Sequence, residues 1–221
     1  MFSYPDGYYM NPLGTLYNTS HAQYTAPIRH FSLPQNDCRR CISKAEADFM
    51  AMNRLLWMEH VNWTRMTIIS IVFGLPDLPY VQERLLRNAT DLGNSLRPFY
   101  GDQIADRYTE LIKEHLIIAA QLVTAAAKGD AATAEAKEKE WYRNANDIII
   151  FLNRINPYLS IEAVQKMFYT HLALTKKEAV AMIQKNYQEG VRIFDVVQAE
   201  AIAMSDMIAS AIVMQFCYLF Y

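Results

Sequence analysis

The fold is decided by the stretch WMEHVNWTR, residues 57–65, which lies in the middle of a long apolar segment. Apolar side chains recur there at intervals of three and four residues, the spacing of one face of an α-helix. On such a helix His60 shares the inward face with Leu56, at a place where leucine is the usual residue. Two more histidines, His115 and His171, occur in similar settings further along the chain. The central question is therefore what these three histidines do.

Outward from this stretch, helical patterns follow one another from residue 43 to residue 215. Their starts carry capping residues, such as the Ser43–Glu46 box, and their ends carry Gly or Pro, such as Gly74 and Pro98. These signals predict six helices, at about 43–73, 77–96, 102–129, 130–156, 160–185 and 186–215. Short connections make successive helices antiparallel neighbours, so we predict an all-α, six-helix bundle.

The helices also show an internal repeat. The sequence RNATDL, residues 87–92, recurs as RNANDI at 143–148, 56 residues later, and the same offset relates His115 to His171. Glu59-His60 recurs as Glu114-His115 with an offset of 55 residues. A repeat of this size indicates one helical hairpin present in several copies. We predict three repeated hairpins, with Asp206 as a loose counterpart of the Asn and Asp in the third: about 43–97, 101–156 and 160–215.

The first interpretation of the histidines is structural. All three face the interior of the bundle, where an imidazole without a partner costs about 1–3 kcal/mol per unsatisfied group. Asn88 and Asn144 lie on the apolar edge of the helices that follow, about 28 residues after His60 and His115. Each histidine would then bond an Asn, an Asp or a tyrosine hydroxyl of a nearby helix. Such polar layers would fix how the helices are aligned.

The second interpretation is a metal site in the bundle core. Imidazoles and carboxylates from several helices hold Fe, Mn or Zn in such cores. The chain offers five candidate ligands: His60, His115, His171, Glu59 and Glu114. The di-iron signature Glu-x-x-His is absent, because Glu and His are adjacent here and point about 100° apart on the helix. A metal is therefore expected only if the three histidines converge.

No pattern in the chain indicates a chemical reaction. There is no Gly-rich phosphate loop and no nucleophile elbow, so we predict a protein that is not an enzyme. A small-molecule or haem pocket around Trp57 and Trp63 is a third hypothesis. Cys38 and Cys41 form a single CxxC without a second ligand pair for zinc, which leaves two free thiols or a disulfide as the alternatives.

The two ends of the chain differ from the bundle. Residues 1–42 are rich in Tyr, Asn and Pro and are expected to form an extended arm, and residues 216–221 are expected to form a tail with four aromatics. Exposed aromatics are unfavourable on a monomer, so we expect them to pack on the bundle or on another copy. The expected assembly is a homo-oligomer or a larger one. Its expected self-association residues are Tyr8, Tyr9, Tyr218, Phe220 and Tyr221.

Composition limits the other partners. The 221 residues are 52% hydrophobic, enough for a sizeable core, and the net charge is −2. This balance gives no electrostatic reason to expect nucleic acid or an anionic membrane as a partner. No apolar run reaches the roughly 20 residues of a membrane span, and the first residues do not have the pattern of a secretory signal. We therefore expect synthesis in the cytoplasm and no membrane partner.

The chain also resembles a family of small helical proteins from spore-forming Firmicutes. The resemblance is carried by residues 56–70, 83–88, 98–102 and 171–176, and it covers about the last three quarters of the chain. Members are often labelled acetylglutamate kinase, but this sequence has no nucleotide-binding loop to match that label. The resemblance implies a helical bundle from a spore former. We thus expect a self-assembling structural protein, with the spore envelope as its location, and a ferritin-like metal-binding bundle as the alternative.

Overall fold

The computed structural model describes residues 8–10, 16–18 and 41–221. The chain divides into two compact units, Met1–Cys41 and Ile42–Tyr221. This boundary lies one residue before the predicted one. In the first unit, the strands β1 (Tyr8–Met10) and β2 (Leu16–Asn18) pair antiparallel. The second unit includes the aromatic tail, which we had expected to be a separate segment.

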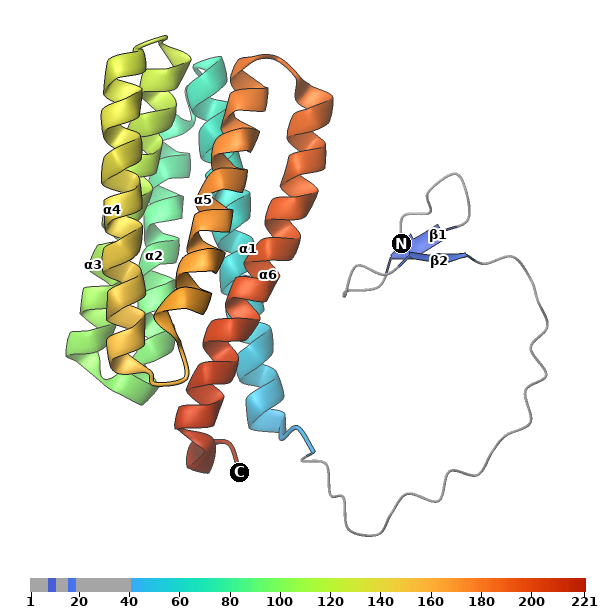
Figure 1. Cartoon of the computed structure of the whole chain (residues 1–221), viewed down its shortest axis with the longest axis vertical. Coiled ribbons are helices and arrows are strands. Elements are labelled where there is room, and N and C mark those ends of the chain that lie inside the picture. Colours follow the sequence, from blue (N-terminus) through green and yellow to red (C-terminus); the bar gives the residue numbers. More distant parts are fainter. Residues whose placement is uncertain (1–7, 11–15, 19–40) are drawn as a thin grey trace. The chain divides into compact units, whose positions relative to one another are not determined.

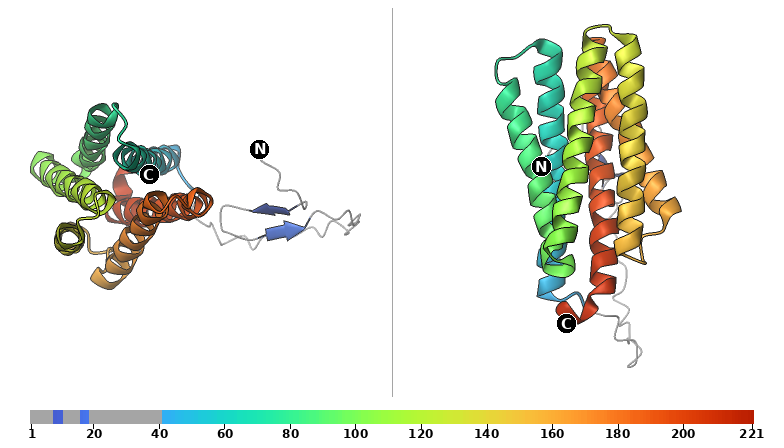
Figure 2. Two further views of the ribbon diagram at one scale, coloured as in Figure 1. Left: turned by 90° about the horizontal axis from the view of Figure 1, so that it is seen from above. Right: turned by 90° about the vertical axis from the view of Figure 1, so that its left-hand side faces the viewer.

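The second unit is a bundle of six α-helices, which confirms the predicted all-α class for the part of the chain that the structure describes (Figure 1). Turns of one to five residues join the helices, so successive helices run antiparallel and lie side by side (Figure 2). A short 3-10 helix, η1 (Cys217–Leu219), follows the last of them. The α-helices are α1 (Lys44–Phe73), α2 (Leu78–Tyr100), α3 (Asp102–Ala127), α4 (Ala131–Ile155), α5 (Ile161–Ile183) and α6 (Tyr187–Gln215).

Most helix starts carry the caps that the sequence predicts. The side chains of Ser43, Asp130, Ser160 and Asn186 each accept a hydrogen bond from the backbone N–H three residues later. The end of α1 is also as predicted, because Gly74 takes the left-handed conformation, with φ of 61°, that an L side chain rarely adopts. Local chemistry therefore sets most of the helix boundaries.

One predicted start lacks its side-chain cap, and one predicted end is wrong. Asp77 occupies the N-cap position of α2, as the predicted start at residue 77 requires, but its carboxylate accepts a hydrogen bond from the hydroxyl of Ser70 and not from the helix backbone. The end of α2 lies beyond Pro98, at Tyr100. A proline this close to a helix end removes only one backbone hydrogen bond. The extra turn places Phe99 against Phe49, with ring centroids 5.0 Å apart, and that packing favours continuing the helix.

The helices that carry the histidines form the inside of the bundle. α1, α3 and α5 contact one another, whereas α2, α4 and α6 pack between them around the outside. Among the pairs of helices that follow each other in the sequence, α4 and α5 contact each other least. This arrangement brings His60, His115 and His171 into the interior, where all three are buried.

One helix in the described part of the chain, α6, is long and apolar enough to cross a membrane by length and composition. Half of its most apolar window is buried inside the bundle. Ala201, Met204 and Ala209 on its inward face have no exposed surface. A core helix of a soluble bundle passes the same test, so the apolar character of α6 is explained by its packing.

Candidate functional site

His60 is held by an asparagine of the next helix. Its Nδ1 lies 3.2 Å from the Oδ1 of Asn88, and the Asn88 amide in turn donates to the backbone carbonyl of Leu56, at 2.9 Å. Because that amide group is the donor to the carbonyl, Oδ1 is the acceptor, and the imidazole must carry its proton on Nδ1. The asparagine therefore satisfies the histidine and ties α2 to α1.

His115 is held in the same way one hairpin later. Its Nδ1 lies 2.8 Å from the Oδ1 of Asn144, whose amide donates to the carbonyl of Leu111 at 3.2 Å. Both asparagines have no exposed surface. The structural interpretation is thus confirmed for His60 and His115, whose partners are the two asparagines that the repeat singled out.

His171 has a partner that the sequence reasoning missed. Its Nδ1 lies 2.9 Å from the Oε2 of Glu200. The three pairs are 28, 29 and 29 residues apart in the sequence, so the spacing alone was a signal for Glu200. Asp206, the expected counterpart, instead forms a two-pronged ion pair with Arg54 at 2.7 Å. In this third pair a carboxylate takes the place of the neutral amide.

Burial controls the charge of the first two histidines. It lowers the pKa of His60 to about 3, and the neighbouring His171 adds to this effect. Burial likewise lowers the pKa of His115 to about 3, against a smaller opposing effect of the bond to Asn144. Both imidazoles are therefore neutral at physiological pH because of their burial.

The expected metal ligands do not gather into one cluster. The ring centroids of His60 and His171 are 5.9 Å apart, but Glu59 accepts a hydrogen bond from Arg84 at 2.8 Å and Glu114 accepts one from Arg143 at 2.7 Å. Each glutamate is next to its histidine in the sequence, so its side chain points about 100° away around the helix. Both carboxylates therefore face the next helix and not the histidine. Within residues 8–10, 16–18 and 41–221, no group of three or more His, Cys, Asp or Glu side chains is arranged to hold a metal ion.

A buried ion pair lies on the α5–α6 side of the core. Arg65 donates to the carboxylate of Glu178, which is 1% exposed, and also to the carbonyl of Gly190. The guanidinium lies 4.6 Å from the ring centre of Phe194. Burial raises the pKa of Glu178, while the charge of Arg65 opposes that rise. The pair joins α1 to α5 and α6.

The bundle is hollow between α1, α3, α4 and α5. This interior chamber has a volume of about 300 Å³, and most of its lining is aliphatic. Alanines line much of it where larger side chains would fill the space: Ala119, Ala120, Ala126, Ala131, Ala134 and Ala179. Glu135 of α4 and Lys176 and Val180 of α5 also line it and are exposed, so the hollow opens to the surface between these two helices. The expected pocket around Trp57 and Trp63 is not found here, since Trp141 is the tryptophan that lines the chamber.

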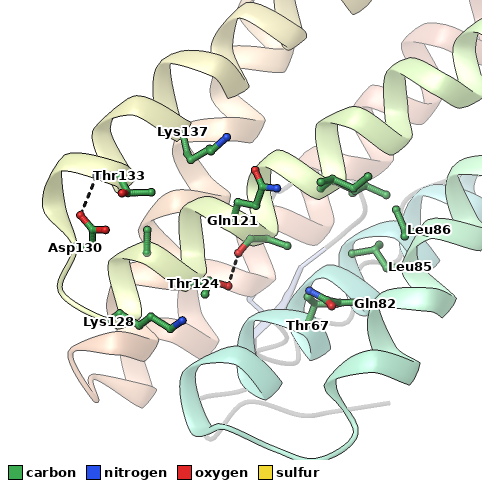
Figure 3. Close-up of a pocket in the computed structure, with 14 residues that line it drawn as sticks. Thr67, Gln82, Leu85, Leu86, Gln121, Thr124, Lys128, Asp130, Thr133 and Lys137 are labelled. Atoms are coloured by element: carbon green, nitrogen blue, oxygen red, sulfur yellow. Dashed lines mark hydrogen bonds between the residues drawn. The ribbon is translucent and has the colours of Figure 1, made fainter.

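A second hollow, the outer pocket, adjoins the chamber. It has a volume of about 510 Å³ and opens between α2, α3 and α4 (Figure 3). Its outer part is polar, with Gln82, Gln121, Lys128 and Lys137 on its rim. The two hollows share four wall residues: Thr67, Leu85, Leu116 and Ala120. A few side chains therefore separate the apolar chamber from the outer pocket and its polar rim.

The aromatic tail is divided between the core and the surface. Phe220 is buried, with its ring centroid 5.4 Å from that of Phe49, and the Tyr221 hydroxyl donates to Glu46. Tyr218 is 71% exposed and its neighbour Leu219 is 50% exposed. Of the expected self-association residues in the tail, Tyr218 is thus the most accessible.

The remaining predicted residues lie in or near the first unit. Tyr8 and Tyr9 belong to β1, and the structure describes only their backbone. Cys38 lies outside the described residues, so its disulfide stays a prediction. Cys41 is exposed, and Cys217 is an exposed free thiol.

Comparisons with protein-family models, curated proteins and solved structures find no match to this chain.

Proposed function

We propose that the protein is not an enzyme and that its bundle binds a small, mainly apolar molecule in the interior chamber. The observation that carries this proposal is the chamber itself, a mainly apolar hollow of about 300 Å³ that extends from the surface between α4 and α5 into the core. Pockets that hold small molecules are concave, mostly apolar and supplied with a few polar groups. The volume corresponds to on the order of ten water-sized groups.

The core histidines support this proposal indirectly. Their side chains hold α1 to α2 and α3 to α4 through buried hydrogen bonds, and that bonding fixes helices on both sides of the chamber. Trp141, which lines the chamber, has its ring centroid 5.2 Å from that of His115. These buried hydrogen bonds thus help to hold in place the helices that surround the hollow.

The test compares ligand binding before and after the chamber is filled. A naphthalene carrying a short alkyl group serves as the probe, and its own fluorescence reports binding. The wild-type protein should bind it saturably at one site. Ala179→Leu brings an isopropyl group into the chamber and should weaken binding by at least about tenfold. Ala136→Leu, on the exposed side of α4, is the matched control and should bind as the wild type does.

Folding of the filled variant is checked in the same experiment. Leucine at a hollow position should leave the free energy of unfolding unchanged or raise it, since it fills space rather than displacing atoms. If Ala179→Leu is poorly folded, Ala134→Leu fills the chamber from α4 instead. Absence of saturable binding to the wild type, or equal binding to a well-folded filled variant, would contradict the proposal.

Self-association remains a second proposal, favoured by one observation. Tyr218 and Leu219 lie next to each other and expose large apolar surfaces beside the buried Phe220. The double variant Tyr218→Ser with Leu219→Ser removes this surface and keeps the buried ring. Sedimentation velocity should show an assembly for the wild type and a smaller species for the variant. A monomeric wild type at high protein concentration would exclude this role for the tail.

A further inference from the structure

The interior chamber extends along the four helices that surround it, which run beside one another (Figure 1). At the end beside the core histidines, each of these helices contributes one residue to the wall: Thr64, Leu116, Trp141 and Thr175. At the opposite end, each again contributes one: Ile71, Ala126, Ala131 and Ile183. A helical rise of about 1.5 Å per residue places the two ends roughly 10–15 Å apart. A round hollow of about 300 Å³ would be shorter than this, so the chamber is elongated.

The volume of the chamber agrees with this length for a single extended chain. A cavity of about 150 Å³ holds the six carbons of benzene, so the chamber, with about 300 Å³, holds roughly twelve carbons. Carbon–carbon bonds of about 1.5 Å advance an extended alkyl chain by roughly 1.3 Å per carbon, so twelve carbons span about 15 Å. A fused ring system of the same volume is much shorter and would leave one end of the chamber empty. The chamber therefore fits a linear chain better than a compact one.

The wall between the two ends suits a hydrocarbon. It consists mainly of alanines and larger aliphatic side chains, such as Ile68, Leu122 and Val123. Two threonines of α1 also line it, but Thr64 and Thr67 donate their hydroxyls to backbone carbonyls four residues earlier. These hydroxyls therefore need no hydrogen bond from a ligand. Each methylene group moved from water into such a wall should tighten binding about fourfold.

The chamber opens on one side, between α4 and α5. Glu135 of α4 and Lys176 and Val180 of α5 are exposed members of its lining. The charged groups at this opening are paired, because Lys176 donates to both carboxylate oxygens of Glu138, at 2.6 and 2.7 Å, and Glu135 accepts from Lys139 at 2.6 Å. The end at Trp141 is closed, since that residue is 3% exposed. A ligand can thus keep a polar head group in water at the opening while its chain lies inside.

We propose that the chamber binds a linear amphiphile, whose alkyl chain of about ten to twelve carbons lies along the helices and whose polar head group stays in water between α4 and α5. This inference rests on the proposed function, because it names the ligand class of the same chamber. The methyl end of the chain lies toward Trp141, and the length of the chamber sets the longest chain that fits.

The test measures how affinity depends on chain length. The naphthalene probe occupies the chamber, and primary alcohols from hexanol to tetradecanol compete with it, so the loss of its bound fluorescence gives each dissociation constant. Calorimetric titration measures the alcohols directly. Affinity should rise about fourfold per methylene up to a limit of roughly twelve carbons and then stop rising, because further methylenes remain in water.

Two variants at one end of the chamber show whether its length sets this limit. Ala126→Leu extends the wall into the hollow by an isopropyl group, and it should lower the limit by about three carbons. Ala126→Val extends the wall less and should lower the limit by about two carbons, which also covers the case of a poorly folded leucine variant. Ala136→Leu, on the exposed side of α4, is the matched control and should keep the wild-type limit.

The outcomes separate the two proposals. If neither the naphthalene probe nor any alcohol binds, the chamber is not a ligand site and both proposals are wrong. If the probe binds but the alcohols do not displace it, the chamber stands as a ligand site and the inference about a linear ligand is overturned. The same conclusion follows if affinity rises through tetradecanol without a limit, or if both folded Ala126 variants keep the wild-type limit.

Discussion

The two neutral buried histidines should make the protein unusually sensitive to mild acid. Burial lowers the pKa values of His60 and His115 to about 3, whereas an unfolded chain has histidines with a pKa of about 6.5. Between these values the unfolded state binds more protons than the folded state. Stability is therefore complete above about pH 6.5 and is lost as the pH falls toward 3.

The size of the effect follows from the two pKa values. Lowering the pH from 7.5 to 5 protonates each histidine in the unfolded state and neither in the folded state, which removes about 2 kcal/mol per histidine. The two together amount to roughly 4 kcal/mol, a large part of the 5–15 kcal/mol typical of a whole domain. Glu178 works in the opposite direction, because its raised pKa lets the folded state take up a proton earlier. It offsets part of the loss.

Urea denaturation followed by circular dichroism at the two pH values measures this difference. His115→Gln is the informative variant, since an amide can still donate to Asn144 but does not titrate. Its free energy of unfolding should fall by about 2 kcal/mol less than that of the wild type over the same pH range. If His115→Gln folds poorly, His60→Gln makes the same comparison. Equal stability of the wild type at the two pH values, or an equal loss in a folded variant, would refute the argument.

Four further predictions concern the core, and urea denaturation measures each of them. Asn144→Ala should lower the free energy of unfolding by about 2–4 kcal/mol, because it leaves an imidazole N–H without a partner and removes a second buried hydrogen bond, to the carbonyl of Leu111. Arg65→Met should cost about 3–5 kcal/mol at neutral pH, because it leaves the buried Glu178 carboxylate alone, and less at acidic pH, where that carboxyl can protonate. Gly93→Ala should cost about 1–3 kcal/mol, since its methyl group would lie 2.7 Å from a backbone oxygen of α3. Gly190→Ala should be nearly neutral, because its nearest neighbour is a flexible methionine sulfur at 3.1 Å.

The sequence determined the helices and their boundaries by local chemistry. Capping side chains such as Ser43 and a glycine such as Gly74 act within one helical turn, so their effect can be read without knowing the fold. The spacing of apolar residues likewise placed the histidines on inward faces. An inward polar residue must find a partner, and the repeated asparagines were the right candidates for His60 and His115.

Glu59 and Glu114 show a limit of prediction from the sequence, because neither lies with the histidines as the predicted metal site requires. Adjacency in sequence groups Glu59 and Glu114 with the histidines, but the next residue on a helix points about 100° away. Arginines of the neighbouring helices bind both carboxylates. Glu200 was overlooked because the repeat was followed by residue type rather than by spacing.

Only the tertiary structure decided which polar groups meet and where the core is hollow. A buried hydrogen bond depends on how two helices are rotated and shifted against each other, and no pattern within one helix states that. The interior chamber arises because alanines from α3, α4 and α5 face one another across the bundle. In the sequence they are only good helix formers. The length of the chamber likewise emerges only once these helices are in place, because residues of four different helices form each of its two ends.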